Sequence, residues 1–230
     1  MIQKTFWLPD EKIDQIFLNY LPNLKSKIIV FEGVNGSGKT TYAHALGKII
    51  ASAGYDVLVT QEPGHIPVSW ELVGTLDSTA QCLLYLADRT EHIHSVIQPA
   101  LADNKIVICD RFFDSSYVYH PDCSNMVKHF NLSILTEIGA SIYRIFWLDL
   151  SPDIAIDIVA EREKKSVGVV PKNLKDFREI SDRYKQTMGM SPVRKRHRIS
   201  LPSRDVLREI KQSLVFGDGG FKLPDESDES

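Results

Sequence analysis

The sequence GVNGSGKT at residues 33–40 matches the phosphate-binding pattern G-x-x-x-x-G-K-[ST] at every fixed position. A short apolar, β-branched run precedes it at 28–31, and apolar residues at helical spacing follow from Lys39. Glycines let consecutive backbone N–H groups turn inward around a phosphate, and the N-terminus of the next helix adds partial positive charge. The pattern therefore predicts a strand, a phosphate-binding loop and a helix, with a nucleoside triphosphate as the ligand.

The residues of this loop have expected roles in nucleotide binding. Lys39 should reach the β- and γ-phosphates, and the hydroxyl of Thr40 should ligate Mg²⁺. An ordinary glycine-rich turn that caps a helix is the alternative interpretation. We assign ATP binding to Gly33, Asn35, Gly36, Ser37, Gly38, Lys39, Thr40 and Thr41.

A second apolar run, at residues 106–109, ends in Asp110 and resembles a Walker B strand. Its carboxylate is expected at the carboxyl edge of the sheet, where ligands bind in open α/β folds. Asp110 would hold Mg²⁺ directly or through water, together with Thr40. An ordinary aspartate at the end of a strand is the alternative.

Apolar runs and helical patterns alternate along the rest of the chain. Strands are predicted at 28–31, 56–60, 106–109, 145–148 and 198–201, and helices at 13–21, 39–50, 79–101, 152–165, 174–187 and from 203. Alternating strands and helices imply a parallel sheet that is covered on both faces. We expect one domain at 27–215, an N-terminal extension at 1–26 packed on it, and an acidic, disordered tail at 216–230.

The composition excludes several classes of protein. The 230 residues are 43% hydrophobic and 25% charged, and the sequence contains no apolar run long enough to span a membrane. The net charge of −3 arises mainly in the tail, so the nearly neutral body gives little support for nucleic-acid binding. Three widely spaced cysteines and the absence of a secretory signal favour a reducing compartment, the cytoplasm.

Several further segments resemble the thymidylate kinase family, the nucleoside monophosphate kinases that phosphorylate dTMP with ATP. They occur in the family's order: Phe31-Glu32-Gly33, Gln61-Glu62-Pro63-Gly64, the stretch LYLADRTEH at 84–92, the stretch DRFFDSS at 110–116, and FWLDLSP at 146–152. The resemblance implies a three-layer P-loop kinase sandwich of the α/β class, with a central parallel sheet of about five strands. It also implies ATP as donor, Mg²⁺ as cofactor, a pyrimidine nucleoside monophosphate as acceptor, and a homodimer.

The resemblance also assigns roles to matching positions. Arg111 would clamp the acceptor phosphate and act in catalysis with Lys39 and Asp110, because a guanidinium offers forked donors to phosphate oxygens. Tyr85 would stack on the pyrimidine, and Arg89 would contact the base or the phosphate of the acceptor. The other expected acceptor residues are Glu62, near the sugar or the metal, Ser115 and Ser116, which would line the base pocket, and Tyr119 and His120.

Each of these positions also has a plainer interpretation. Tyr85 lies in an apolar run and could be a core residue. Arg89 could lie on a solvated helix face, the two serines could cap the following helix, and Arg111 could be a surface residue.

The chain departs from the family pattern where the acceptor would bind. Gln61 replaces an arginine, Asn35 an acidic residue of the loop, and Val73 a phosphate-binding arginine, for which His65 is a candidate substitute. His120 stands where the family has a glutamine that reads the pyrimidine edge. The expected lid, residues 161–173, offers only Arg162, to which we assign a catalytic role, and lysines.

These departures leave two candidate acceptors, dTMP and a modified dUMP. They also motivate an alternative, a nucleotide-binding regulatory protein with weak or no kinase activity. A P-loop ATPase or GTPase ranks last, because nothing resembles a switch element or a guanine-specific motif. The basic run at 194–198 is interpreted as solvated, with a phosphate or nucleic-acid patch as the sharper alternative.

Overall fold

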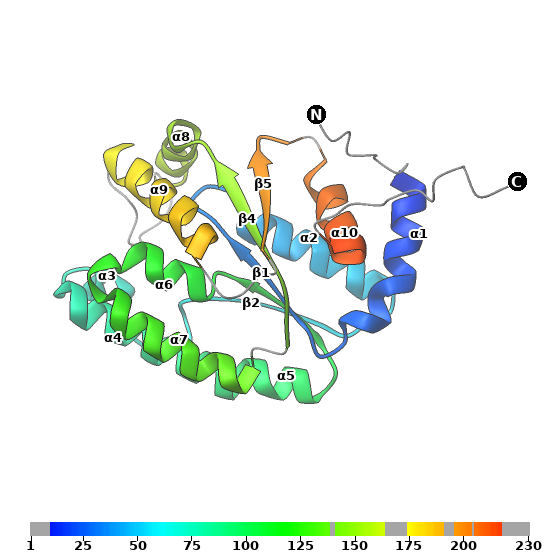
Figure 1. Ribbon diagram of the computed structural model, residues 1–230, viewed down its shortest axis with the longest axis horizontal. Coiled ribbons are helices and arrows are strands. Elements are labelled where there is room, and N and C mark those ends of the chain that lie inside the picture. Colours follow the sequence, from blue (N-terminus) through cyan, green and yellow to red (C-terminus); the bar gives the residue numbers. More distant parts are fainter. Residues whose placement is uncertain (1–9, 139–140, 164–173, 191–195, 204, 218–230) are drawn as a thin grey trace, which may run out of the picture.

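The computed structural model describes residues 10–138, 141–163, 174–190, 196–203 and 205–217. At its centre is a five-stranded parallel sheet in the order β2-β3-β1-β4-β5 (Figure 1). The strands are β1 (Ile28–Glu32), β2 (Val57–Gln61), β3 (Ile106–Asp110), β4 (Ile142–Leu150) and β5 (Arg196–Leu201). The predicted α/β fold with a covered parallel sheet is confirmed.

The two faces of the sheet bury different sets of side chains, because successive residues of a strand point to opposite faces. Ile29 and Phe31 of β1 pack with α1 (Asp10–Tyr20), α2 (Lys39–Ser52) and α10 (Val206–Phe216). Ile28 and Val30 pack on the other face with α5 (Gln98–Ala102), α7 (Ser124–Ile138) and the turn before α5. The continuous apolar run that predicted β1 thus reflects burial on both faces of the sheet.

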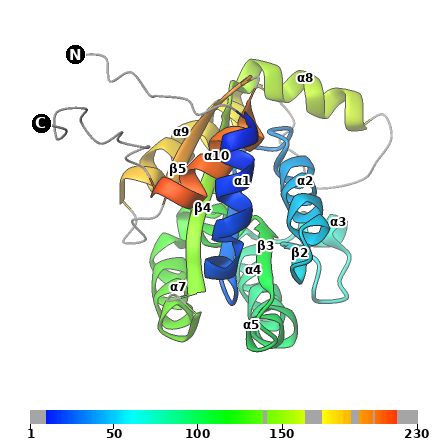
Figure 2. The ribbon, with the colours of Figure 1, turned by 90° about the vertical axis from the view of Figure 1, so that its right-hand side faces the viewer.

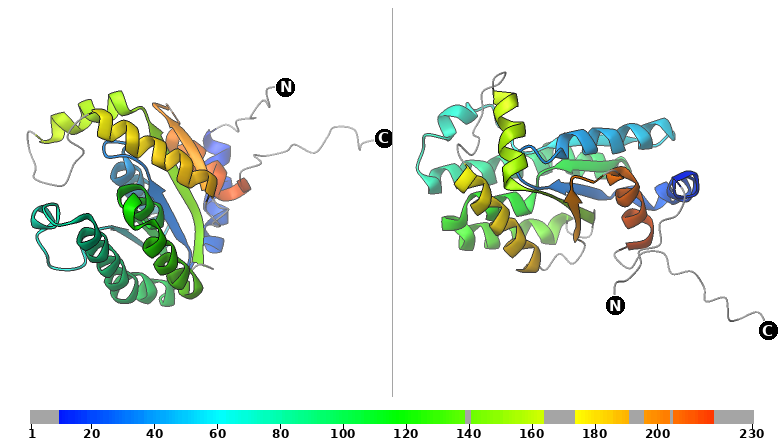
Figure 3. Two further views of the ribbon diagram at one scale, coloured as in Figure 1. Left: turned by 60° about the vertical axis from the view of Figure 1, so that its left-hand side comes forward. Right: turned by 90° about the horizontal axis from the view of Figure 1, so that it is seen from above.

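Two further helices cover the end of the sheet where the strands finish. They are α8 (Pro152–Glu163) and α9 (Leu174–Met190), which lie side by side at the opposite end of the molecule from α5 (Figures 1 and 3). Their apolar side chains form a separate cluster with Val34, Trp147 and Leu150. This cluster holds α9 beside α6 (Phe113–Tyr119), which follows β3.

The single helix predicted at 79–101 is interrupted. It consists of α4 (Ser78–His92), one turn of π-helix at Ile93–Ile97, and α5. Asp77 begins α4 by accepting the backbone N–H of Thr79 at 2.8 Å, the usual role of an N-cap carboxylate. The helices α6, α7 and the short α3 (Trp70–Val73) were not among those predicted.

The N-terminal segment shares the core of the domain. Ile13 and Phe17 of α1 are fully buried, and α1 lies against α10 (Figure 2). Asp14 pairs with Lys211 of α10 across this contact. Within the described residues, no helix combines the length and the apolar character that a membrane span requires.

Candidate nucleotide-binding site

The phosphate-binding loop joins β1 to α2 at the carboxyl end of the central strand. Gly33 has a φ of +148°, and a Cβ there would lie 2.6 Å from the backbone oxygen of Leu148. No larger residue fits this position, since both the backbone conformation and the space exclude a side chain. The loop therefore has the tight turn that its glycines predicted.

Inside the loop, two polar groups are held away from solvent. The buried Lys39 donates from Nζ to the backbone oxygen of Val34 at 2.9 Å. The Ser37 hydroxyl is buried and has no hydrogen-bond partner within the described part of the chain. An unpaired buried hydroxyl at the start of a helix is suited to an anionic ligand, which would accept its hydrogen bond.

The two expected metal ligands meet beside this loop. Thr40 donates its hydroxyl to Oδ2 of Asp110 at 2.5 Å, while Oδ1 of Asp110 is buried without a partner among the residues described. Both residues line a cavity of about 290 Å³ together with Ala43, His44, Val59, Thr60 and Gln61. An unpaired carboxylate oxygen next to a hydroxyl is the donor set that Mg²⁺ prefers, so these residues fit the ion.

A second cavity, of about 340 Å³, lies between the loop, α4, α6 and α9. We call it the acceptor pocket. All eight residues expected to contact the acceptor line it, as does Asn35 of the loop. The complete lining is Asn35, Glu62, Pro63, Gln81, Tyr85, Asp88, Arg89, Arg111, Ser115, Ser116, Tyr119, His120, Asp176 and Ile180.

Arg111 joins the phosphate-binding loop to the acceptor pocket. Its Nη1 donates to the backbone oxygen of Gly33 at 3.3 Å, and its Nη2 donates to Oδ1 of Asn35. The guanidinium also lies over the ring of Tyr119, 5.1 Å from its centroid. Because Arg111 touches the phosphate-binding loop and lines the acceptor pocket, its charge lies between the loop and the pocket rather than on the surface.

Tyr85 and His120 form one wall of the acceptor pocket. Their rings lie 4.9 Å apart at a tilt of 46°. Burial, aided by the charge of Arg89, lowers the pKa of His120 to about 4, so the imidazole is neutral near pH 7. A neutral imidazole has one donor and one acceptor nitrogen, whereas a glutamine amide has two donor hydrogens and an oxygen.

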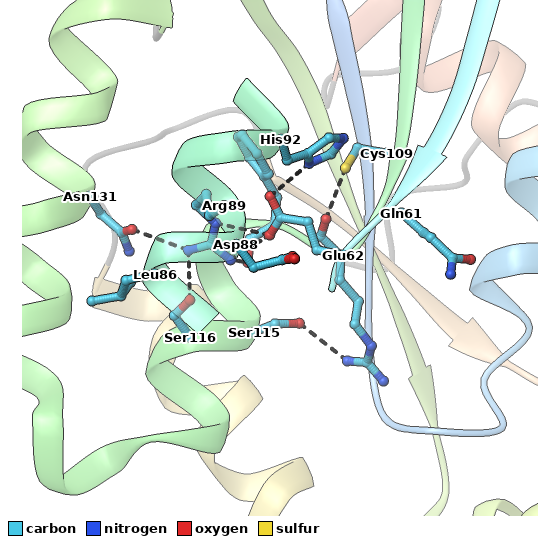
Figure 4. Close-up of polar contacts among 12 residues, drawn as sticks. Gln61, Glu62, Leu86, Asp88, Arg89, His92, Cys109, Ser115, Ser116 and Asn131 are labelled. Carbon is cyan, nitrogen blue, oxygen red and sulfur yellow. Dashed lines mark hydrogen bonds and ion pairs between the residues drawn. The ribbon is translucent and has the colours of Figure 1, made fainter. Parts of the chain in front are cut away.

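Arg89 lies deeper, and all five of its N–H donors already have partners within the protein (Figure 4). Its Nε and Nη2 contact Oε2 of Glu62 at 2.9 and 2.6 Å. The remaining bonds go to Ser116, Asn131 and the backbone oxygen of Phe112. The side chain is therefore neither solvated nor free, and it can bind an acceptor through hydrogen bonds only by giving up one of these partners.

Glu62 is the anionic centre of the same network. Burial alone would raise its pKa, but the charge of Arg89 and the bond to His92 hold that pKa below the usual range. His92 contacts Oε1 of Glu62 at 3.1 Å through Nδ1 and the Thr60 hydroxyl at 2.8 Å through Nε2. The glutamate expected near the sugar or metal is thus an ion-paired residue at the wall of the acceptor pocket.

The loop after Glu62 is fixed by a residue that the sequence analysis did not single out. Asp88 accepts the backbone N–H groups of Gly64, His65 and Ile66 at 3.0, 2.6 and 2.7 Å. His65, considered as a substitute phosphate ligand, stacks on His92 at 3.7 Å and is not part of the pocket lining. Val73, at the family's arginine position, is buried.

Other residues of the site were also missed. Gln81, Asp176 and Ile180 line the acceptor pocket, and Glu32 and Tyr184 lie behind its wall. Gln81 could have been found from the sequence, because it lies one helical turn before Tyr85. No sequence signal indicated the contacts from α9, because they join residues about 150 positions apart in sequence.

The basic run is only partly described, since residues 194 and 195 lie outside the described ranges. Arg196 of β5 forms a buried ion pair with Asp114 of α6, with Nε 2.9 Å from Oδ2. Arg198 pairs with Asp149 and lies over the ring of Trp147. Arg196 is therefore enclosed by the protein, which differs from a solvated run, whereas the Arg198 side chain is 58% exposed, as expected for one. Most of the expected lid, 164–173, and the side chain of Arg162 also lie outside the described parts.

A phosphate-binding loop at the carboxyl edge of a parallel sheet, facing a second pocket across an arginine, defines a P-loop kinase that acts on a small phosphorylated acceptor.

Comparison with known proteins identifies the family. A family model described as thymidylate kinase matches residues 31–210. A thymidylate kinase of Caldicellulosiruptor saccharolyticus is 33% identical over 185 residues, which cover 73% of this chain and 88% of that protein. The chain belongs to the thymidylate kinase family, and it is accordingly an ATP-dependent nucleoside monophosphate kinase.

Two further relatives extend this comparison. A thymidylate kinase of Pelotomaculum thermopropionicum is 47% identical over 104 residues, but the match covers only 42% of this chain and 48% of that protein. The crystal structure of thymidylate kinase from Ehrlichia chaffeensis superimposes with a TM-score of 0.56 at 26% identity, covering 78% of this chain and 89% of the other. The similarity thus extends over most of the described domain.

Proposed function

We propose that this chain is a thymidylate kinase, which transfers the γ-phosphoryl group of ATP to the 5′-phosphate of dTMP. The observation that carries the proposal is the place of Arg111, which contacts the phosphate-binding loop and lines the acceptor pocket. A guanidinium between two phosphates neutralises charge in an in-line transfer, which depends on positioning and electrostatics rather than on a covalent nucleophile.

The proposal gives each side of the site its substrate. ATP binds at residues 33–41, with its β- and γ-phosphates at Lys39. Thr40 and Asp110 hold Mg²⁺, which supplies charge neutralisation on the donor phosphates when it is bound. The acceptor base stacks on Tyr85, and the serines 115 and 116 with Tyr119 and His120 surround it.

A modified deoxyuridylate is a second candidate acceptor, and His120 is the observation that favours it. The neutral imidazole presents a donor–acceptor pattern at the base that differs from that of the family's glutamine. A pyrimidine with a different substituent could match this pattern better than thymine does.

The homodimer implied by the family resemblance is also proposed, and sedimentation velocity tests it.

The experiment that tests the function is an ATP-coupled screen over dTMP, dUMP, 5-hydroxymethyl-dUMP, dCMP, UMP and CMP. The proposal predicts the highest kcat/KM with dTMP, and the second candidate predicts it with the modified dUMP. Mg-ATP binding without turnover on any monophosphate would favour a regulatory protein, and acceptor-independent hydrolysis would favour an ATPase.

A further inference from the structure

A fully buried carboxylate, that of Glu32, lies at the end of β1 directly before the phosphate-binding loop. Its Oε1 accepts the backbone N–H groups of Phe112 and Ser115 at 2.8 and 3.2 Å. Its Oε2 accepts the hydroxyl of Ser115 at 2.7 Å and that of Tyr184 at 3.1 Å. A buried carboxylate is costly unless hydrogen bonds compensate it, so these four bonds fix its position firmly.

The same two hydroxyls also contact Arg111. Its Nη1 lies 3.2 Å from the Ser115 oxygen and 3.3 Å from the Tyr184 oxygen. When Glu32 is ionised, its carboxylate can only accept hydrogen bonds, whereas a guanidinium can only donate them. In that state each hydroxyl donates its single hydrogen to Glu32 and accepts from Arg111, which gives the two bridges one direction.

These bridges tie the arginine to three elements of the fold. Glu32 belongs to β1, Ser115 to α6, and Tyr184 to α9, the helix that follows the expected lid. Arg111 itself has a φ of +71°, a conformation that non-glycine residues rarely adopt. A long side chain on such a backbone needs external contacts to hold one rotamer, and the two hydroxyls provide two of them.

We propose that Glu32 is a positioning residue for the acceptor reaction, which acts through the hydroxyls of Ser115 and Tyr184 to aim the Arg111 guanidinium at the acceptor phosphate. The inference rests on the proposed function, because that function gives Arg111 its contact with the acceptor. Glu32 is not among the residues that line the acceptor pocket. It differs in this from every residue to which the sequence analysis gave an acceptor role.

The experiment compares steady-state kinetics of the full-length wild type, Glu32→Gln and Tyr184→Phe with ATP and dTMP. Tyr184→Phe removes only the hydroxyl and keeps the buried ring beside Trp147. Matched controls are Tyr143→Phe, whose hydroxyl bonds to the Leu214 backbone oxygen at 2.8 Å, and Glu209→Gln, which pairs with His197. We expect both test variants to raise KM for dTMP about tenfold, the effect of one well-placed hydrogen bond, with KM for ATP and both controls unchanged.

A second measurement separates positioning from a merely structural role. In an Arg111→Met background, Glu32→Gln should cause no further increase in KM for dTMP, because its effect passes through the missing guanidinium. An unchanged KM for dTMP in both test variants, an equal rise for both substrates, or an additive effect in the double variant would overturn the inference. If the wild type phosphorylates no nucleoside monophosphate, the proposed function fails and this inference fails with it; if the wild type turns over dTMP normally, only the inference is at stake.

Discussion

Truncation of Arg89 should destabilise the whole domain, beyond any effect on ligand binding. In Arg89→Met, the Glu62 carboxylate stays buried without its guanidinium, and among the described residues His92 remains as its side-chain partner. Breaking a buried ion pair by removing one partner costs about 3–5 kcal/mol, because an uncompensated charge is left behind. The lost bonds to Ser116, Asn131 and Phe112 act in the same direction.

Equilibrium urea denaturation followed by circular dichroism at pH 7 measures this effect. The matched control is Arg178→Met, since Arg178 pairs with Asp153 on the surface, where both side chains are more than 60% exposed and such pairs contribute about 0–1 kcal/mol. The double variant Arg89→Met/Glu62→Met should recover at least about 2 kcal/mol of the loss, because it removes the stranded charge.

Two results would refute this reasoning. Arg89→Met could unfold within about 1 kcal/mol of the wild type, which would mean that the buried ion pair does not stabilise the fold. Alternatively, the Arg89 and Glu62 substitutions could be additive, which would mean that the two groups do not interact in the folded protein.

Three other predictions concern the loop, the metal site and the buried titratable groups. Gly33→Ala should abolish ATP binding in calorimetry, because its Cβ would lie 2.6 Å from a backbone oxygen; binding within threefold of the wild type would contradict this. Asp110→Asn should raise the Mg²⁺ concentration needed for half-maximal activity, with the free-ion titration of the wild type as reference, and an unchanged requirement would exclude Asp110 as a ligand. Burial and the charge of Asp114 raise the pKa of Glu32 to about 7, so its contribution to the free energy of unfolding is fully present below pH 4.5 and falls by about 3 kcal/mol as the pH rises to 7. In urea denaturation over this pH range, Glu32→Gln should remove that fall in the free energy of unfolding. The lowered pKa of His120 makes its contribution to that free energy rise with pH between 4 and 6.5, and its replacement should remove this rise. Wild-type and variant curves that stay parallel across pH would contradict both expectations.

The fold could be read from the sequence because its signals are local. Each of β1 to β4 contains a short apolar run, and residues 33–40 fix the order of strand, loop and helix. Strand β5 mixes basic and apolar side chains and carries a weaker signal. The helix boundaries were less accurate. The π-helical turn at Ile93–Ile97 keeps the apolar spacing of its neighbours, and α7 follows two very short helical segments that hide its start.

The site was predictable only where a motif carries it. The residues expected to contact the acceptor do line one pocket, because α4 and α6 bring their motifs together above the sheet. The network behind that pocket was not predictable. Arg89 was expected to meet a ligand or solvent, yet Glu62 and Asn131, 27 and 42 positions away, take up its donors. Such pairings depend on how helices pack, which single-sequence patterns do not encode.

The proposed reaction transfers the γ-phosphoryl group of ATP to dTMP across Arg111. Incubation of the wild-type protein with ATP, dTMP and Mg²⁺, followed by chromatography of the nucleotides, tests it most directly, with Lys39→Ala as the inactive control. The account predicts ADP and dTDP in equal amounts from the wild type and neither from the variant. ADP without dTDP, or full transfer by Lys39→Ala, would contradict it.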